Sequence, residues 1–320
     1  MSGVLAFQLY NWHFFFQQLV GGVTAGSLYA LIALGYTMVY GVLKLLNFAH
    51  GDVYMVGVYI GWFVLNALGS PTDPVLPLVP LLLVAFAASM LGCGVLGVAI
   101  ERFAYRPLRN APRIAPLITA IGISFFLEQT AVLLWGANPR EYNAFSLHNG
   151  ELFGFVNVGN FGIEYVQLFV IVATVVLMIG LSLFVWRTRT GKAMRAISFD
   201  REAASMMGID VDFVIAVTFL IGSALAGAAG VMTGLISPTG SLNPYMGFGA
   251  GLKAFTAAVV GGIGNIVGAV LGGLFIGIVE TFTVAYFSSQ FSDLILFSLL
   301  VIFMLIRSTG FRGTAVLQKV

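Results

Sequence analysis

The sequence has little charge and almost no cysteine. Only 9% of its 320 residues are Asp, Glu, Lys or Arg, whereas 59% are hydrophobic. Soluble domains carry about a quarter of charged residues, so this composition excludes an ordinary soluble fold. The single cysteine, Cys93, lies inside an apolar run and excludes an intramolecular disulfide, so cysteine usage does not identify the redox compartment. The first twenty residues also lack the basic segment of a cleavable signal peptide.

Motifs typical of enzymes and nucleotide-binding proteins are also missing. Residues 92–97 match GxGxxG, but they lie within an apolar run with no strand before them, so they do not predict a dinucleotide site. Gly191 and Lys192 lack the upstream glycine and the following Ser or Thr of a P-loop. The three histidines lie far apart in the sequence. We therefore expect a chain that is not an enzyme, with no ATP site of its own, no metal and no cofactor.

Long apolar runs recur along the whole chain. Each has about 20 residues, enough to cross a hydrocarbon core roughly 30 Å thick. Continuous apolar runs favour helices over barrel strands, which alternate apolar and polar residues. We predict an all-α fold, a polytopic transmembrane helical bundle that forms a single domain over residues 1–320, with eight or nine spans. The expected spans are 19–40, 53–68, 77–100, 115–135, 165–186, 213–236, 252–268, 269–287 and 290–306.

Basic residues predict the orientation, because Lys and Arg favour the cytoplasmic side of a membrane. Of the fifteen basic residues, four lie in segment 101–113, five in segment 187–212, and three after Ile306. The long loop 136–164 has only Arg140. These counts place the N-terminus outside and the C-terminus inside. Segment 187–212 and the tail then need an even number of spans between them, which favours nine crossings, or eight plus a re-entrant segment.

Segment 187–212, here called the charged segment, lies between two predicted spans. Asp200 can cap a short helix over 201–207, with Glu202 in its first turn and Gly208 at its end. Asp212 can then cap the next span. The short helix would present an apolar surface, which suits docking into a groove of a soluble partner better than contact with water. This surface would consist of Ala203, Ala204, Met206 and Met207.

Two further stretches allow alternative interpretations. Residues 41–52 contain Lys44, Asn47, His50 and Asp52 close together in the sequence before the second span. They could form either a polar surface turn or a broken helix that lines a pathway. Residues 237–255 contain prolines and glycines that break helices. They could form either an extracellular turn or a partly buried re-entrant segment. Residues 252–287 fit two short spans or one broken span. Glycines spaced four residues apart, as in 264, 268 and 272, indicate close helix packing.

The sequence Glu202-Ala203-Ala204, followed by Gly208, resembles the EAA motif of ABC importer permeases. Further stretches resemble the high-affinity branched-chain amino acid ABC permeases, and specifically the first of the two permease subunits in that family. The similarity extends from about residue 17 to 310. The stretches are 35–41, 47–51, 53–55, 100–102, 105–107, 243–245, 253–259 and 261–264. At position 44 the resemblance implies an uncharged residue, so Lys44 departs from it.

The resemblance implies a permease in the bacterial inner membrane that lies in the lipid bilayer and does not bind nucleic acid. It would pair with a second, homologous permease and with two cytoplasmic ABC ATPases, while a periplasmic binding protein delivers leucine, isoleucine or valine. The charged segment would be its cytoplasmic coupling loop, with ATPase-coupling residues Asp200, Glu202, Ala203, Ala204 and Gly208. Urea or another small amide or amino acid is the alternative cargo for the same machinery.

An ion-coupled secondary transporter is a different class of function. Such a protein needs ionisable groups deep in its spans, whereas nearly all ionisable residues here are expected at span edges. A branched cargo needs apolar contacts along its pathway, and its zwitterion needs a few fixed polar groups. The candidate pathway residues are Tyr36, Thr37, Tyr40, Asn47, His50, Asn243, Tyr245 and Lys253.

Overall fold

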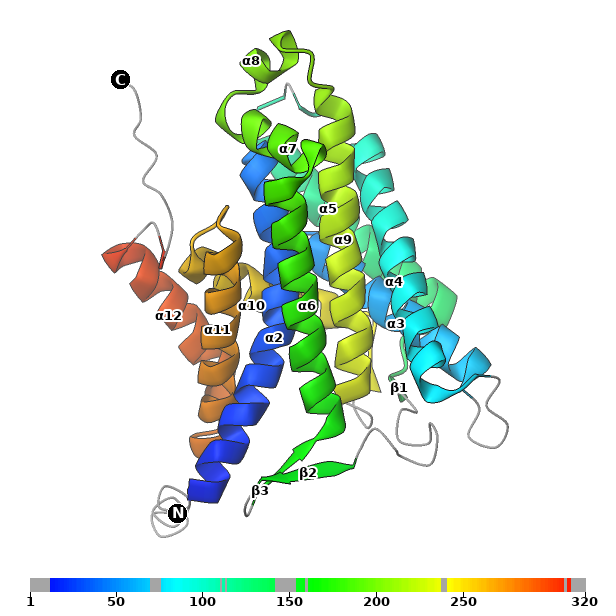
Figure 1. Cartoon of the computed structure of the whole chain (residues 1–320), viewed down its shortest axis with the longest axis vertical. Helices are drawn as coiled ribbons and strands as arrows, with labels where there is room; N and C mark the ends of the chain where they lie inside the picture. The colour runs from blue at the N-terminus through cyan, green and yellow to red at the C-terminus, as the bar shows by residue number, and fades with distance from the viewer. Residues whose placement is uncertain are drawn as a thin grey trace.

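The computed structural model describes residues 12–69, 76–109, 111–112, 114–141, 154–158, 161–236, 241–307 and 310–311. Within them, eight helices are long and apolar enough to cross a membrane, which confirms the predicted all-α bundle (Figure 1). They are α2 (Trp12–Leu43), α3 (His50–Leu68), α4 (Leu78–Ile100) with the π-helix η1 (Glu101–Tyr105), α5 (Ile114–Trp135), α6 (Tyr165–Arg187), α9 (Val211–Ile236), α11 (Ile266–Tyr286), and η3 (Ser289–Phe291) with α12 (Ser292–Ile306).

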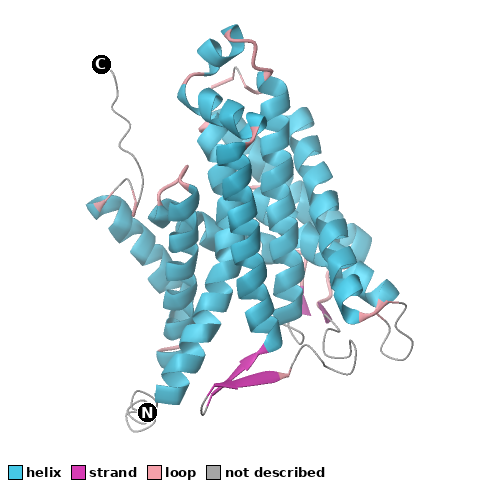
Figure 2. Cartoon of the chain, in the orientation of Figure 1, coloured by secondary structure: helices cyan, strands magenta, loops and turns pink. Residues whose placement is uncertain are grey.

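The remaining elements lie at the two ends of the bundle. Helices α7 (Arg189–Phe199) and α8 (Arg201–Met206) form one end, opposite the start of α2 (Figure 1). Short antiparallel strands lie at the other end (Figure 2). The hairpin is β2 (Phe155–Val158) with β3 (Phe161–Glu164), and β1 (Arg140–Glu141) pairs with β4 (Ser241–Leu242). Sequence patterns did not predict α7, which begins where the Thr188 hydroxyl accepts a hydrogen bond from Gly191 N.

A short helix, α10 (Met246–Gly261), replaces the predicted span over 252–268. Its 16 residues extend about 24 Å, less than the thickness of a hydrocarbon core. Both α9 and α11 run antiparallel to α2, so the chain must return across the bundle between them (Figure 1). The structure therefore supports eight long spans plus one short intervening helix. The predicted boundary was wrong because glycines 247, 249 and 251 lie inside α10 rather than in a loop.

Glycine contacts hold the helices together, as the spacing of the glycines predicted. A Cβ added to Gly277 of α11 would overlap the backbone of Gly26 in α2. One added to Gly57 of α3 would lie 2.7 Å from Gly227 Cα of α9. Gly264 is different, because it lies in the turn before α11 with a positive φ of 95°. The glycines of the rejected GxGxxG match also lie at helix contacts, where Gly97 of α4 meets the Ser223 side chain and Gly92 meets the Ile60 side chain.

Candidate functional site

Helix α8 has the two ends that the sequence predicted. The carboxylate of Asp200 accepts hydrogen bonds from the backbone N–H of Glu202 at 2.9 Å and of Ala203 at 3.0 Å. After the last helical residue, Met206, the chain leaves the helix through Gly208, whose φ of 82° favours glycine. A six-residue helix rarely forms alone, so both caps contribute to its stability.

Large apolar side chains are exposed around α8 and at the end of its neighbour α7, next to the charged residues Arg201 and Glu202. Phe199, Met206 and Met207 are 92%, 82% and 84% exposed. Ala204 is buried and Ala203 is exposed, so only part of the predicted apolar surface faces outward. Figure 1 shows α8 beyond the ends of the long helices, where a soluble protein could reach it. Sequence reasoning missed Phe199, which becomes part of this surface only because α7 and α8 follow each other directly.

A cluster of ion pairs lies at the same end of the bundle. Arg109 pairs with both Glu101 of η1 and Asp212 of α9, and Arg106 also pairs with Asp212. The predicted cap at Asp212 was therefore wrong. Asp210 caps α9 instead, accepting a hydrogen bond from Phe213 N at 3.0 Å. Arg106 and Arg109 thus connect the η1 region to Asp212 in the first turn of α9, two residues after the capping residue Asp210.

The connection between α2 and α3 is exposed at Lys44 and buried at Asn47, Ala49 and His50. Lys44 has a left-handed backbone, with φ of 55°, and desolvation lowers the pKa of its ammonium group. The chain then turns back into the bundle, because His50 in the first turn of α3 packs against Gly35, well before the end of α2. Asn47 and His50 are buried. The interpretation as a surface turn holds for Lys44 alone, and the chain turns back as α3 instead of continuing α2 as a broken helix.

The predicted pathway residues of α2 and α3 fall into two neighbouring groups. Tyr36 and His50 contact each other with ring centroids 4.9 Å apart, and Thr37 is buried beside them on α2. Asn47 instead accepts a hydrogen bond from the Tyr105 hydroxyl of η1 at 3.1 Å. Tyr40 is half-buried and lies under Lys44 Nζ, 5.9 Å from the ring centroid.

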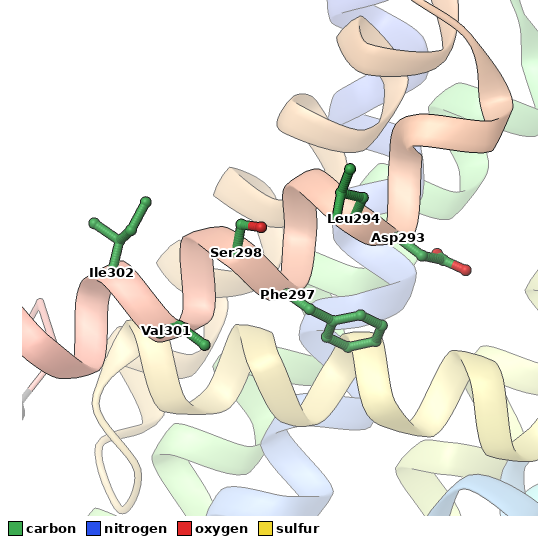
Figure 3. A pocket seen from close by; sticks show the side chains of 6 residues that line it. All are labelled: Asp293, Leu294, Phe297, Ser298, Val301 and Ile302. Carbon is green, nitrogen blue, oxygen red and sulfur yellow. The ribbon is translucent and has the colours of Figure 1, made fainter.

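The remaining predicted residues lie at and along α10. Asn243 accepts a hydrogen bond from Tyr245 N, which forms the turn that starts this helix. Lys253 pairs with Glu280 of α11 at 2.6 Å and with Asp293 of α12 at 3.1 Å, so it joins three helices. Asp293 also begins an open groove along α12 (Figure 3). The groove is lined by Asp293, Leu294, Phe297, Ser298, Val301 and Ile302.

Ionisable groups also lie deep in the bundle, which corrects the expectation that nearly all are at span edges. Asp52 of α3 is 0% exposed and accepts a hydrogen bond from the Ser124 hydroxyl in the middle of α5. Glu128 lies one turn further along α5 and is also buried. Neither carboxylate was among the candidate pathway residues. Asp52 falls in a polar sequence stretch, whereas the sequence around Glu128 gave no comparable signal.

Comparisons with known proteins show the family to which the chain belongs. Residues 18–305 match the family described as "Branched-chain amino acid transport system / permease component". The chain is 45% identical to the high-affinity branched-chain amino acid transport system permease protein BraD of Pseudomonas aeruginosa, covering 96% of this chain and 98% of that protein.

Two further relatives are similar over most of their lengths. Permease protein LivH of Escherichia coli K12 is 43% identical, over 96% of this chain and 98% of the relative. A probable LivH of Methanocaldococcus jannaschii is 30% identical, over 85% and 82%. Eight helices of the described residues are long and apolar enough to cross a membrane, so this chain is a multi-pass membrane protein, and it belongs to the family of branched-chain amino acid transport system permease components.

Proposed function

We propose that this chain moves branched-chain amino acids across the bacterial inner membrane as one permease subunit of an ATP-driven importer. This cargo and transport role are supported by sequence identities of 45% and 43% to transport permeases over nearly the whole length of the chain. A second homologous permease and a periplasmic binding protein would complete the pathway. The end of the bundle that carries α7 and α8 would face the cytoplasm, where two separate ATPase subunits bind.

The observation that carries the coupling role is the exposed apolar surface of Phe199, Met206 and Met207 around a helix with defined caps. A loop in contact with water gains nothing from exposing three large apolar side chains, whereas a groove of a partner buries them. Asp200 and Gly208 fix the ends of α8, and Glu202 and Ala203 lie on its exposed side. Movement of the ATPases would then reach the spans through α8 and the adjoining start of α9.

The test replaces Met206 and Met207 with serine in the same chain. Burying the two side chains contributes about 1.5–3 kcal/mol each, so we expect the ATPases to co-purify poorly and ATP-driven leucine uptake to fall. Leu134→Ala is the matched control, because Leu134 is 69% exposed on α5 near the opposite end of the bundle. Unchanged ATPase co-purification and uptake in the serine variant would contradict the docking role.

The choice of cargo is tested separately in proteoliposomes that contain the assembled importer and its binding protein. We expect leucine, isoleucine and valine to compete with one another for uptake, and urea not to compete. Uptake that persists without the ATPases would instead favour an ion-driven carrier.

A further inference from the structure

Asp52 is the most deeply enclosed carboxylate of the bundle described above. It lies in the first turn of α3, after the connection from α2, and none of its surface is exposed. One carboxylate oxygen, Oδ2, accepts the hydrogen bond from Ser124 of α5. The other, Oδ1, has no hydrogen-bond partner from another residue in the described part of the chain. Buried carboxylates inside a membrane need a partner, so this oxygen requires an explanation.

The free oxygen faces the start of α10. A Cβ added to Gly247, in the first turn of α10, would lie 2.5 Å from Asp52 Oδ1. On the same side, Gly51 packs on the backbones of Gly247 and Gly251. Gly51 meets Gly247 and Gly251 through backbone atoms, while the Asp52 side chain and the Tyr36 hydroxyl also lie against these two glycines. Separation of α10 from α3 would uncover Oδ1.

A second carboxylate lies beside the first. Glu128 follows Ser124 by four residues, so both side chains lie on the same face of α5. Since Ser124 donates its hydrogen bond to Asp52, Glu128 lies one turn of α5 away from that contact. The ion pairs of the described residues connect Arg106 and Arg109 with Glu101 and Asp212, and Lys253 with Glu280 and Asp293. Among the residues that the structure describes, no basic side chain is therefore paired with Asp52 or Glu128.

We propose that Asp52 and Glu128 bind the α-ammonium group of the amino acid during its passage between α3, α5 and α10. This inference rests on the proposed function. An ammonium group carries three N–H donors and one positive charge, which fits the free Oδ1 of Asp52 and a second carboxylate, neither of them paired with a basic residue within the described ranges. The hydroxyl of Ser124 holds Asp52 in place, and Tyr36, whose hydroxyl lies near Gly251, adds an aromatic wall for the apolar side chain.

The experiment uses the complete importer in proteoliposomes and compares the wild type with Asp52→Asn and Glu128→Gln. Loss of a charged hydrogen bond corresponds to about a tenfold effect or more, so we expect leucine uptake per ATP hydrolysed to fall by that factor in Asp52→Asn. ATP hydrolysis stimulated by the binding protein should continue, and Asp52→Glu should recover part of the uptake. Glu128→Gln, at the less enclosed position, should show a smaller loss in the same direction.

The control is Glu164→Gln, which removes a carboxylate at the start of α6 and should leave uptake unchanged. If the wild-type importer transports leucine and the Asp52→Asn variant transports it equally well, this inference is overturned but the proposed function is not. Wild-type uptake that drops when external sodium is replaced by N-methylglucamine would overturn it in favour of a sodium site. A wild-type importer that moves no branched-chain amino acid would overturn the proposed function as well.

Discussion

Arg109 shows how one side chain can connect distant parts of the sequence. Its guanidinium is 6% exposed and pairs with Glu101, which is 2% exposed, and with Asp212 at the start of α9. Planar guanidinium groups suit such double pairing, which lysine does not reproduce. Arg109 therefore holds η1 and α9 together just below the exposed helix α8. Tyr105 of the same π-helix then reaches Asn47 in the buried part of the connection between α2 and α3.

We predict that Arg109→Met strongly destabilises the protein. The substitution leaves Glu101 as a buried, unpaired charge, and breaking a buried pair in this way costs about 3–5 kcal/mol. Thermal denaturation of the detergent-solubilised chain, followed by size-exclusion chromatography, measures the effect. The double variant Arg109→Met with Glu101→Gln removes the stranded charge and should recover a large part of the loss. A single variant as stable as the wild type would show that Glu101 does not depend on Arg109.

At the scale of helices, the contact between α2 and α11 depends on glycine. Gly22 and Gly26 of α2 face Gly273 and Gly277 of α11, and the backbones lie close enough to exclude any Cβ. Within a membrane, such van der Waals contact between backbones replaces the hydrophobic driving force that holds helices together in water. The same arrangement joins α3 to α9 through Gly57 and Gly227.

Gly277→Val should therefore separate α2 from α11. The added side chain would overlap the backbone of Gly26, and overpacking of this kind costs about 1–3 kcal/mol or more. Gly180→Val is the matched control, because a Cβ at Gly180 of α6 meets nothing within 4 Å. We expect a lower yield of monodisperse protein for Gly277→Val only. Equal losses for both variants would mean that valine in a helix, rather than this contact, is responsible.

At the scale of the whole molecule, the orientation is open to a direct test. Cys93 is buried, so it should react poorly with a membrane-impermeant maleimide. We predict that Met206→Cys is labelled only when the inner face of the membrane is accessible, as in inverted vesicles. Phe155→Cys, in the strand hairpin at the opposite end, should be labelled from the outside of intact cells with a permeable outer membrane. The reverse pattern would invert the proposed topology.

Much of the fold could be predicted from the sequence because the membrane requires long apolar runs in the spans and favours basic segments on one side. The short helix α8 was predictable too, since Asp200 and Gly208 are local signals. The course of residues 241–265 was not predictable, because Gly247 and Gly251 look like helix breakers until their partner Gly51 is known. The pairing of Asp52 with Ser124 and the ion pairs of Arg109 join residues far apart in the sequence, so no local pattern indicates them.

The antiparallel contact of α2 with α11 also has a consequence for how the protein is made. Helix α2 leaves the ribosome first, yet its glycine-lined face is covered by a helix made more than 200 residues later. During that interval the face stays open to lipid or to helper proteins of the membrane. Contacts that close so late in synthesis expose a chain to misassembly, so a nascent chain that stalls before α11 would be a ready target for membrane proteases.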